Sequence, residues 1–245
     1  MTLSKLIEGK TAIVTGASRG IGKAIAIKLL KEGHSISIGV RKKESIINTP
    51  LDPSSNNPKR FIVNTYDATV KNSSKEWVEN TVKTFNHIDT LIHCAGIFKR
   101  TNLIFKDNEI KEIEDIWKVN VMGPWTLTKD AWKHLSLSNS GRIIVLVSMS
   151  GKRSKGSLAS YSMSKFALMS LCQTMRNEGW NHGIRVTAIC PGWVNTDMAK
   201  EINNFPKEDM IQTHDIANIC SNLLSLPNSS VPFEISLNCQ LETTG

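Results

Sequence analysis

The segment Thr15-Gly16-Ala17-Ser18-Arg19-Gly20-Ile21-Gly22 follows an apolar run, Thr11–Val14, and leads into a helical pattern. In that pattern the apolar residues Ile21, Ile25 and Leu29 recur every four positions. Glycines permit a tight turn and a close backbone approach to a pyrophosphate, and the first amide groups of a helix attract its negative charge. A strand, a glycine turn and a helix in this order therefore favour a nucleotide-binding loop over the plain alternative, a flexible connection between a strand and a helix.

Short runs with little polar alternation, such as Ile143–Val147 and Val186–Ile189, recur between longer helical segments. Runs of this kind are typical of strands that are buried on both faces. Their alternation with helices predicts an α/β fold, a single-domain doubly wound parallel sheet of the Rossmann type with helices on both faces. The ligand crevice of such a sheet lies at the carboxyl ends of the strands. Four residues fall at or just beyond such ends: Gly16, Ala95, Ser148 and Pro191.

The composition predicts one domain over residues 1–245, since 40% hydrophobic content supports a substantial core and no compositional break separates two parts. Met1–Lys10 carries charges and no long apolar run, and no run of about 18 apolar residues follows, so we expect a cytoplasmic protein without a membrane partner. The five cysteines are scattered and fit buried free thiols in a reducing compartment. The net charge of +8 is dispersed rather than gathered in a basic run, so we expect no nucleic-acid partner.

Tyr161 and Lys165 lie four residues apart in a helix-like run, so they share one face of the helix. The ammonium group of Lys165 is expected to lower the pKa of the Tyr161 phenol, which then exchanges a proton near neutral pH. Ser148 closes an apolar strand thirteen positions before Tyr161. A Tyr-x-x-x-Lys pair alone is most often an ordinary surface pair. Together with the glycine loop, it indicates a catalytic site.

The combined pattern resembles the short-chain dehydrogenase/reductase family over nearly the whole chain. The motifs that carry the resemblance follow the glycine loop in the family's order: Asp67, His93-Cys94-Ala95-Gly96, Asn120, Ser148, Tyr161, Lys165, Pro191-Gly192 and Thr196. The family usually has two asparagines where this chain has His93 and Cys94. That departure concerns the hydrogen bonds that brace the central sheet, because the Ala-Gly pair beside the cofactor is retained.

The resemblance implies hydride transfer between a nicotinamide and a carbonyl or alcohol carbon. Tyr161 is then the general acid in reduction and the general base in oxidation, and Ser148 donates a hydrogen bond to the substrate oxygen. Lys165 holds the nicotinamide ribose and lowers the pKa of Tyr161. Asn120 binds a water that links Lys165 to solvent; the alternative for Asn120 is a mid-helix polar residue with local hydrogen bonds. Gly123-Pro124 indicates an interruption of the helix nearby.

The resemblance also implies the residues that bind the cofactor: Gly16, Ser18, Arg19, Gly20, Ile21, Gly22, Arg41, Asp67, Ala68, Cys94, Ala95, Gly96, Tyr161, Lys165, Pro191, Gly192, Val194 and Thr196. The second strand, Ser35–Val40, is not followed by the acidic residue that binds the adenosine ribose of NAD. Arg41 follows it instead, and Arg19 lies in the glycine loop, where the family often places a cation against a 2′-phosphate. We therefore favour NADP(H) over NAD(H). The alternative for Arg41–Lys43 is a solvated turn, which we accept for the two lysines.

We expect Ser148, Met149, Tyr161 and Trp193 to contact the substrate. The pocket positions are mostly apolar and suit a small ketone, aldehyde or 3-oxo/3-hydroxy acid, interconverted with a secondary or primary alcohol. The first alternative is a 3-oxoacyl thioester reductase of the fatty-acid type. A second class is a non-catalytic nucleotide-binding regulatory protein, and a third is dehydration or epimerisation. The complete set of Asn120, Ser148, Tyr161 and Lys165 argues against the regulatory protein.

The histidines are scattered without metal-ligand spacing, so we expect no metal. His93 sits in an apolar strand and is interpreted as a hydrogen-bonded core histidine. The resemblance further implies a homodimer or homotetramer built on the helices that carry Asn120 and Tyr161. Apolar residues on more than one side of the second helix, such as Phe166 and Met175, agree with this.

Overall fold

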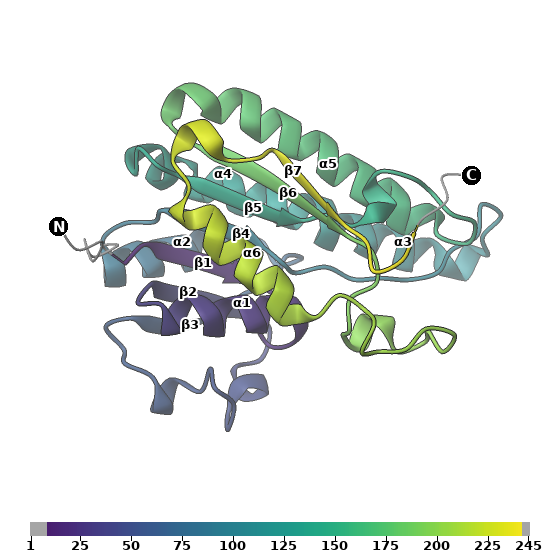
Figure 1. The fold of residues 1–245 in the computed structure, drawn as a ribbon, viewed down its shortest axis with the longest axis horizontal. Coiled ribbons are helices and arrows are strands. Elements are labelled where there is room, and N and C mark those ends of the chain that lie inside the picture. The colour runs from purple at the N-terminus through teal and green to yellow at the C-terminus, as the bar shows by residue number, and fades with distance from the viewer. Residues whose placement is uncertain (1–8, 242–245) are drawn as a thin grey trace.

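A parallel sheet forms the centre of the computed structural model, which describes residues 9–241. Within those residues the sheet has seven strands in the order β3-β2-β1-β4-β5-β6-β7, and every neighbouring pair is parallel (Figure 1). The strands are β1 (Thr11–Thr15), β2 (Ser35–Val40), β3 (Phe61–Thr65), β4 (Thr90–His93), β5 (Arg142–Leu146), β6 (Arg185–Pro191) and β7 (Glu234–Leu237). Residues 1–8 and 242–245, which the predicted domain and the argument from Met1–Lys10 include, lie outside the described residues.

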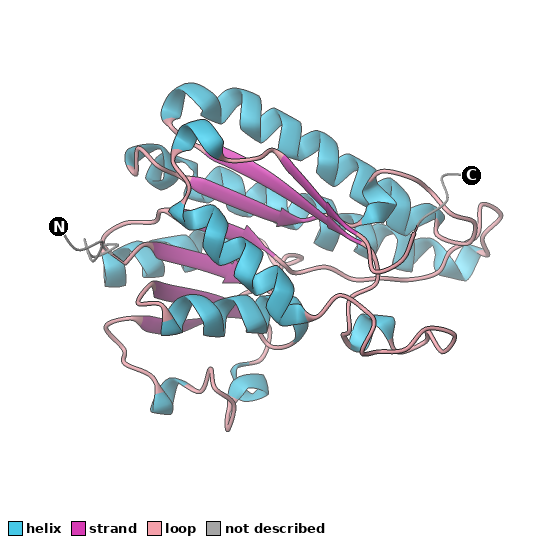
Figure 2. Cartoon of the chain, in the orientation of Figure 1, coloured by secondary structure: helices cyan, strands magenta, loops and turns pink. Residues whose placement is uncertain are grey.

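Helices cover both faces of the sheet (Figure 2). They are α1 (Gly20–Lys31), α2 (Ser73–Phe85), α3 (Ile110–Trp117), α4 (Gly123–Leu137), α5 (Ala159–Gly179) and α6 (Thr213–Ser225). Successive strand residues point to opposite faces, so Val14 belongs to the core under α1 and α6, whereas Ile13 belongs to the core under α2, α4 and α5. The predicted doubly wound fold is confirmed. None of the helices within residues 9–241 is long and apolar enough to cross a bilayer.

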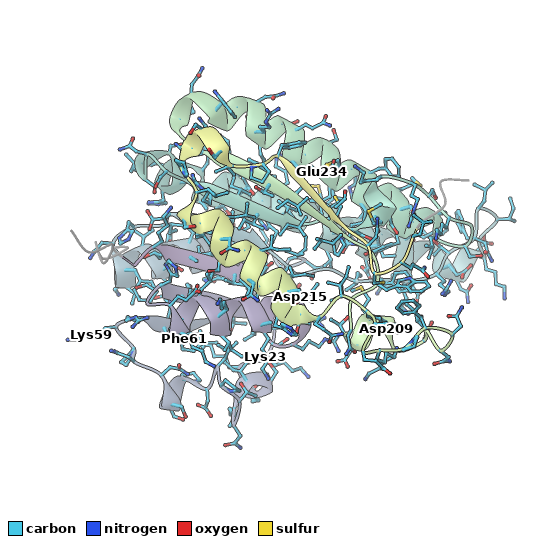
Figure 3. The ribbon with its side chains drawn as sticks, in the orientation of Figure 1. Lys23, Lys59, Phe61, Asp209, Asp215 and Glu234 are labelled. Carbon is cyan, nitrogen blue, oxygen red and sulfur yellow. The ribbon has the colours of Figure 1, made fainter. Side chains whose placement is uncertain are left out.

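The strand order reverses between β1 and β4, which pair through Ala12 with Thr90 and Val14 with Ile92. The chain winds outward from this pair in both directions, so the loops that follow β1 and β4 diverge and leave a crevice. Every residue of β1 and β5 is buried, as the runs Thr11–Val14 and Ile143–Val147 predict, and the charged Arg142 at the start of β5 is buried as well. The segment 197–212 extends beyond the carboxyl ends of the strands, and Figure 3 places Asp209 in it, ahead of α6.

The helix that carries Asn120 is interrupted, as Gly123-Pro124 predicts. A π-helical turn, Lys118–Met122, separates α3 from α4 and contains Asn120. Pro124 has no amide hydrogen, so the carbonyl of Asn120, four residues earlier, lacks its usual helical donor. Turns of this kind are frequent at functional sites. Here the turn contains Asn120, a residue of the predicted catalytic set.

Candidate active site

The glycine loop lies against the end of β4 with almost no space between the two backbones. Gly16 has a φ of +67°, and a Cβ on it would lie 2.8 Å from the amide nitrogen of Ala95. A Cβ on Gly22 would lie 2.6 Å from the carbonyl oxygen of Gly16. Arg19 precedes α1 in extended conformation, and in the described structure no side chain caps the first amides of that helix. The loop therefore offers uncommitted amide donors at a helix start, which suits a pyrophosphate.

Thr15 holds this loop to the end of β4, the neighbouring strand in the sheet, and this role was not predicted. Its hydroxyl accepts hydrogen bonds from the amides of Cys94 and Ala95, both at 2.9 Å, and donates to the carbonyl of Ile92 at 3.4 Å. The signal in the sequence was its place as the first residue of the Thr-Gly motif. Thr15 thus fixes the Ala-Gly backbone at the mouth of the crevice.

Tyr161, Lys165 and Ser148 meet in one cavity of about 450 Å³. The first two lie on α5, and Ser148 lies two residues beyond β5. The Lys165 ammonium lies 5.7 Å from the centre of the Tyr161 ring and donates a hydrogen bond to the Leu146 carbonyl at 2.9 Å. The sheet and α5 together therefore place a phenol, an amine and a hydroxyl at the same strand end.

Burial shifts the acidity of both helix residues. It raises the pKa of Tyr161 to about 12, and a hydrogen bond with Ser148 partly opposes this rise. It lowers the pKa of Lys165 to about 8. The expected lowering of the Tyr161 pKa by Lys165 is not found in this structure, because desolvation of the phenolate dominates. A neutral phenol can give a proton to a developing alkoxide, which suits reduction.

Ser148 has an unusual backbone, with φ 141° and ψ 157°. A residue other than glycine adopts such a conformation only where its surroundings impose it. Here the following turn, Met149–Gly151, packs so closely on α5 that a Cβ on Gly151 would lie 2.8 Å from the Lys165 carbonyl oxygen. The Ser148 hydroxyl accepts a hydrogen bond from the Ser150 amide at 3.1 Å. The packing that imposes this strained backbone thus also fixes the position of the serine relative to Tyr161 and Lys165.

Asn120 is fully buried and holds distant segments together. Its side-chain amide donates to the Ile97 carbonyl at 3.0 Å and to the Ser164 hydroxyl at 3.1 Å, and its oxygen accepts from the Ile97 amide at 2.9 Å. The alternative of local hydrogen bonds is therefore wrong, since the partners lie 23 and 44 positions away. Ser164, which sequence reasoning did not single out, completes the link to α5.

The remaining predicted cofactor residues lie along the same edge of the sheet. The cavity is also lined by Ile21, Cys94, Gly96, Pro191, Gly192, Val194 and Thr196. Arg41 is exposed just after β2, and Asp67 follows β3, where its carboxylate accepts hydrogen bonds from Thr69. Arg19 is exposed and forms an ion pair with Asp197 at 3.2 Å. Among the described residues, no three His, Cys, Asp or Glu side chains gather in a cluster that could hold a metal ion.

The far side of the cavity is mainly aromatic and aliphatic. Phe98 packs edge-on against Tyr161 with ring centres 5.0 Å apart, and Trp193 packs edge-on against Phe205 at 5.3 Å. Met149 is not among the lining residues, because it packs against the core under α5. Phe98, Ser150, Leu158 and Met198, which the apolar pocket positions in the sequence include, also line the cavity. The lining residues that sequence reasoning did not single out are Arg100, Leu146, Val147, Ala199, Glu201, Ile202 and Asn204.

His93 is a buried, hydrogen-bonded core residue, as predicted. It is 3% exposed, and its Nε2 lies 2.9 Å from the Thr128 hydroxyl. Burial lowers its pKa to about 3. The unfolded chain, with an ordinary histidine pKa near 6.5, therefore binds this proton more readily between about pH 3 and pH 6.5. His93 therefore lowers the free energy of unfolding as the pH falls from about 6.5 to about 3.

His93→Asn is expected to remove this contribution. Below pH 6.5 the free energy of unfolding of both proteins should fall as the pH falls. The slope for the wild type should be steeper than that for the variant by up to about 1.4 kcal/mol per pH unit. Urea denaturation at intervals from pH 7.5 to pH 4.5 measures both slopes, and exposed His214→Asn is the control. A constant difference between wild type and His93→Asn across this range would contradict the expectation.

Comparison with known proteins identifies the class. Residues 10–207 match the sequence model of the family described as short chain dehydrogenase. The chain belongs to this family of NAD(P)-dependent dehydrogenases and reductases, which confirms the resemblance seen in the sequence.

Relatives and solved structures agree with that assignment. The chain is 33% identical to an agropine synthesis reductase of Rhizobium rhizogenes over 94% of its own length, but it spans only 53% of that relative. It is 33% identical to a 3-oxoacyl-(acyl-carrier-protein) reductase of Vibrio cholerae, over 81% of this chain and 79% of the relative. An alcohol dehydrogenase from Thermococcus sibiricus, complexed with 5-hydroxy-NADP, superposes with a TM-score of 0.81 at 26% identity, covering 94% of this chain and 96% of that one.

Proposed function

We propose that this chain is an NADP(H)-dependent oxidoreductase that interconverts a carbonyl compound and a secondary or primary alcohol by hydride transfer. The observation that carries the proposal is that Tyr161, Ser148 and Lys165 line the same cavity as Gly96 and Thr196 at the nucleotide end. A bound nicotinamide supplies the hydride donor or acceptor. The close approach of Gly16 to Ala95, which a Cβ would prevent, fits a site for such a dinucleotide.

The chain's own residues then handle the proton and the developing charge. Tyr161 gives its proton to the substrate oxygen in reduction and takes it back in oxidation. The Ser148 hydroxyl donates a hydrogen bond to the same oxygen. Lys165, whose ammonium lies 5.7 Å from the centre of the Tyr161 ring, would hold the nicotinamide ribose. Asn120, which ties Ile97 to Ser164 beside the two catalytic residues of α5, would bind a water that links Lys165 to solvent.

The preference for NADP(H) is supported by Arg41, which is exposed just after β2, where the adenosine ribose would lie, and by Arg19, which is exposed in the glycine loop. Arg41→Ser is expected to lower kcat/KM with NADPH by about 10- to 100-fold, because a charged hydrogen bond to phosphate is lost. The value with NADH should stay within about threefold. Steady-state kinetics with both cofactors measures this, and Lys42→Ser is the matched control. A wild type that prefers NADH would overturn the assignment.

The substrate is proposed to be a small ketone, aldehyde or 3-oxo/3-hydroxy acid, because the cavity wall is largely apolar. A 3-oxoacyl thioester reductase is the second candidate, supported by the relative from Vibrio cholerae. NADPH and NADH oxidation against ketones, aldehydes, 3-oxo acids and 3-oxoacyl thioesters tests both. If no compound is reduced while NADPH binds tightly, the non-catalytic nucleotide-binding protein becomes the better account.

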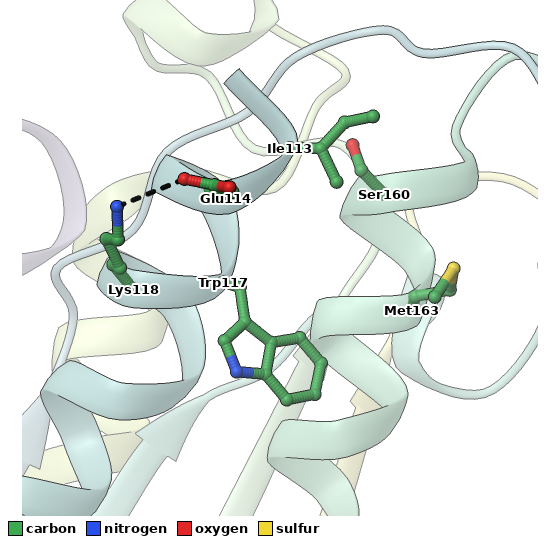
Figure 4. Close-up of a pocket in the computed structure, with 6 residues that line it drawn as sticks. All are labelled: Ile113, Glu114, Trp117, Lys118, Ser160 and Met163. Atoms are coloured by element: carbon green, nitrogen blue, oxygen red, sulfur yellow. Dashed lines mark hydrogen bonds and ion pairs between the residues drawn. The ribbon is translucent and has the colours of Figure 1, made fainter. Parts of the chain in front are cut away.

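We also propose that the chain forms a homodimer or homotetramer. An exposed groove of about 290 Å³ between α3 and α5 is lined by Ile113, Trp117 and Met163, and Figure 4 shows Trp117 and Met163 on its two sides. Trp125 and Phe166 add exposed apolar area on α4 and α5. Analytical ultracentrifugation distinguishes the two assemblies. In our proposal residues 1–245 are one cytoplasmic domain without nucleic-acid or membrane partners.

A further inference from the structure

The mouth of the active-site cavity holds one arginine whose donors are not used. Arg100 lines the cavity together with Tyr161, and its side chain is 59% exposed. Among the described residues it makes no hydrogen bond. Its contacts there are the Phe98 ring, 6.0 Å from the guanidinium carbon, and the Glu201 carboxylate, 3.9 Å from Nε. A pair at that distance and exposure contributes little stability.

The backbone of Arg100 is nevertheless fixed relative to the catalytic tyrosine. The next residue, Thr101, donates its amide to the Ser157 carbonyl at 3.1 Å and accepts from the Ala159 amide at 3.0 Å. Its hydroxyl lies 2.7 Å from that of Ser160, the residue before Tyr161. Phe98 also packs on the Tyr161 ring. The guanidinium therefore extends from a backbone that is attached to the start of α5.

We propose that Arg100 binds a carboxylate of the same substrate whose carbonyl oxygen Tyr161 protonates. The planar guanidinium fork donates two parallel hydrogen bonds to a carboxylate. Glu201 marks the position, since it already brings a carboxylate loosely to that side of Arg100. Leu158, Trp193 and Met198 line the same cavity and suit an apolar chain. The substrate class is thus a carbonyl compound with a terminal carboxylate. That the substrate has a reducible carbonyl rests on the proposed function.

A carboxylate fits better than a phosphate ester. Glu201 lines the same cavity, so its carboxylate would repel a dianion. Among the described residues, Arg100 is the cation that lies beside Glu201 in the cavity lining. The other lining cation, Lys165, is 5% exposed and hydrogen-bonded below the tyrosine. Glu201 is 80% exposed, so its carboxylate can turn into solvent and leave Arg100 to a monoanion.

Calorimetry with hexanoate, hexanamide and hexyl phosphate, in the presence of NADP⁺, tests the site without turnover. We expect Arg100→Met to weaken hexanoate binding about 10- to 100-fold and to leave hexanamide unchanged. Glu201→Gln should strengthen hexanoate binding a few-fold, because a competing carboxylate is removed. Lys99→Met is the matched control, since Lys99 is exposed, paired with Glu112 at 3.0 Å, and not part of the cavity lining.

Equal hexanoate binding by wild type and Arg100→Met, or tighter binding of hexyl phosphate than of hexanoate, would overturn the proposal. Reduction of 5-oxohexanoate and its methyl ester by NADPH separates this proposal from the proposed function. If both are reduced equally well by wild type and Arg100→Met, the oxidoreductase stands and the carboxylate site fails. If neither is reduced while hexanoate binding depends on Arg100, the carboxylate site stands and carbonyl reduction of these compounds fails.

Discussion

Tyr161→Phe is expected to lower kcat for carbonyl reduction by about 10²- to 10⁴-fold and to leave NADPH affinity within a few-fold. In the proposed reaction the variant loses the group that gives its proton to the substrate oxygen, and general acid catalysis is typically worth that much. The phenyl ring retains the edge-on contact with Phe98 at 5.0 Å, so the cavity keeps its shape. Steady-state NADPH oxidation and a fluorescence titration of NADPH measure the two quantities.

Tyr66→Phe is the control for this experiment, because Tyr66 is the other tyrosine of the chain and packs against Trp77, away from the cavity lining. Its kcat should match the wild type. If Tyr161→Phe retained more than a tenth of the wild-type kcat, another group would have to supply the proton, and the assigned role of Tyr161 would be wrong.

Gly16→Ala is expected to lower the free energy of unfolding by about 2–4 kcal/mol and NADPH affinity by about 100-fold or more. The left-handed backbone at φ +67° costs an alanine about 1 kcal/mol, and the added Cβ lies 2.8 Å from the Ala95 amide nitrogen, inside van der Waals contact. The loop must move away from β4, which would misplace the amides that we propose bind the pyrophosphate. Urea denaturation and NADPH titration report the two losses.

Gly156→Ala is the matched control, because a Cβ at Gly156 would meet no atom within 4 Å. We expect its stability to change by no more than about 0.5 kcal/mol. If the two alanine variants behaved alike, the close approach of Gly16 to Ala95 would have no energetic consequence, and the argument from the glycine loop to the dinucleotide would lose its physical basis.

The fold was predictable because its signals are local. The apolar β1 and β5 sequences, the glycine turn and the α1 periodicity each specify their own element, and the alternation of strands and helices leaves few topologies. The residues at strand ends followed from that topology, because parallel strands bring their carboxyl ends to one edge.

The chemistry of the site was less predictable, because it depends on tertiary contacts. Spacing places Tyr161 near Lys165, but only the packed structure shows how far burial raises the pKa of the phenol. The sequence around Asn120 predicts only a polar residue in a helix, and its hydrogen bonds with Ile97 and Ser164 appear only in the folded structure. Arg100 reads as a loop cation, and its position depends on the pairing of Thr101 with the start of α5.

The reversal of strand order between β1 and β4 separates the residues proposed to bind the coenzyme from those proposed to bind the substrate. Arg41 and Asp67 follow strands on one side of the β1–β4 pair, whereas Ser148 and Trp193 follow strands on the other side. Substitutions that are well separated and share no partner change free energies independently. Coenzyme choice and substrate choice should therefore evolve, or be engineered, as separable traits, and a variant selected for a new coenzyme can be combined with one selected for a new carbonyl compound without readjusting either.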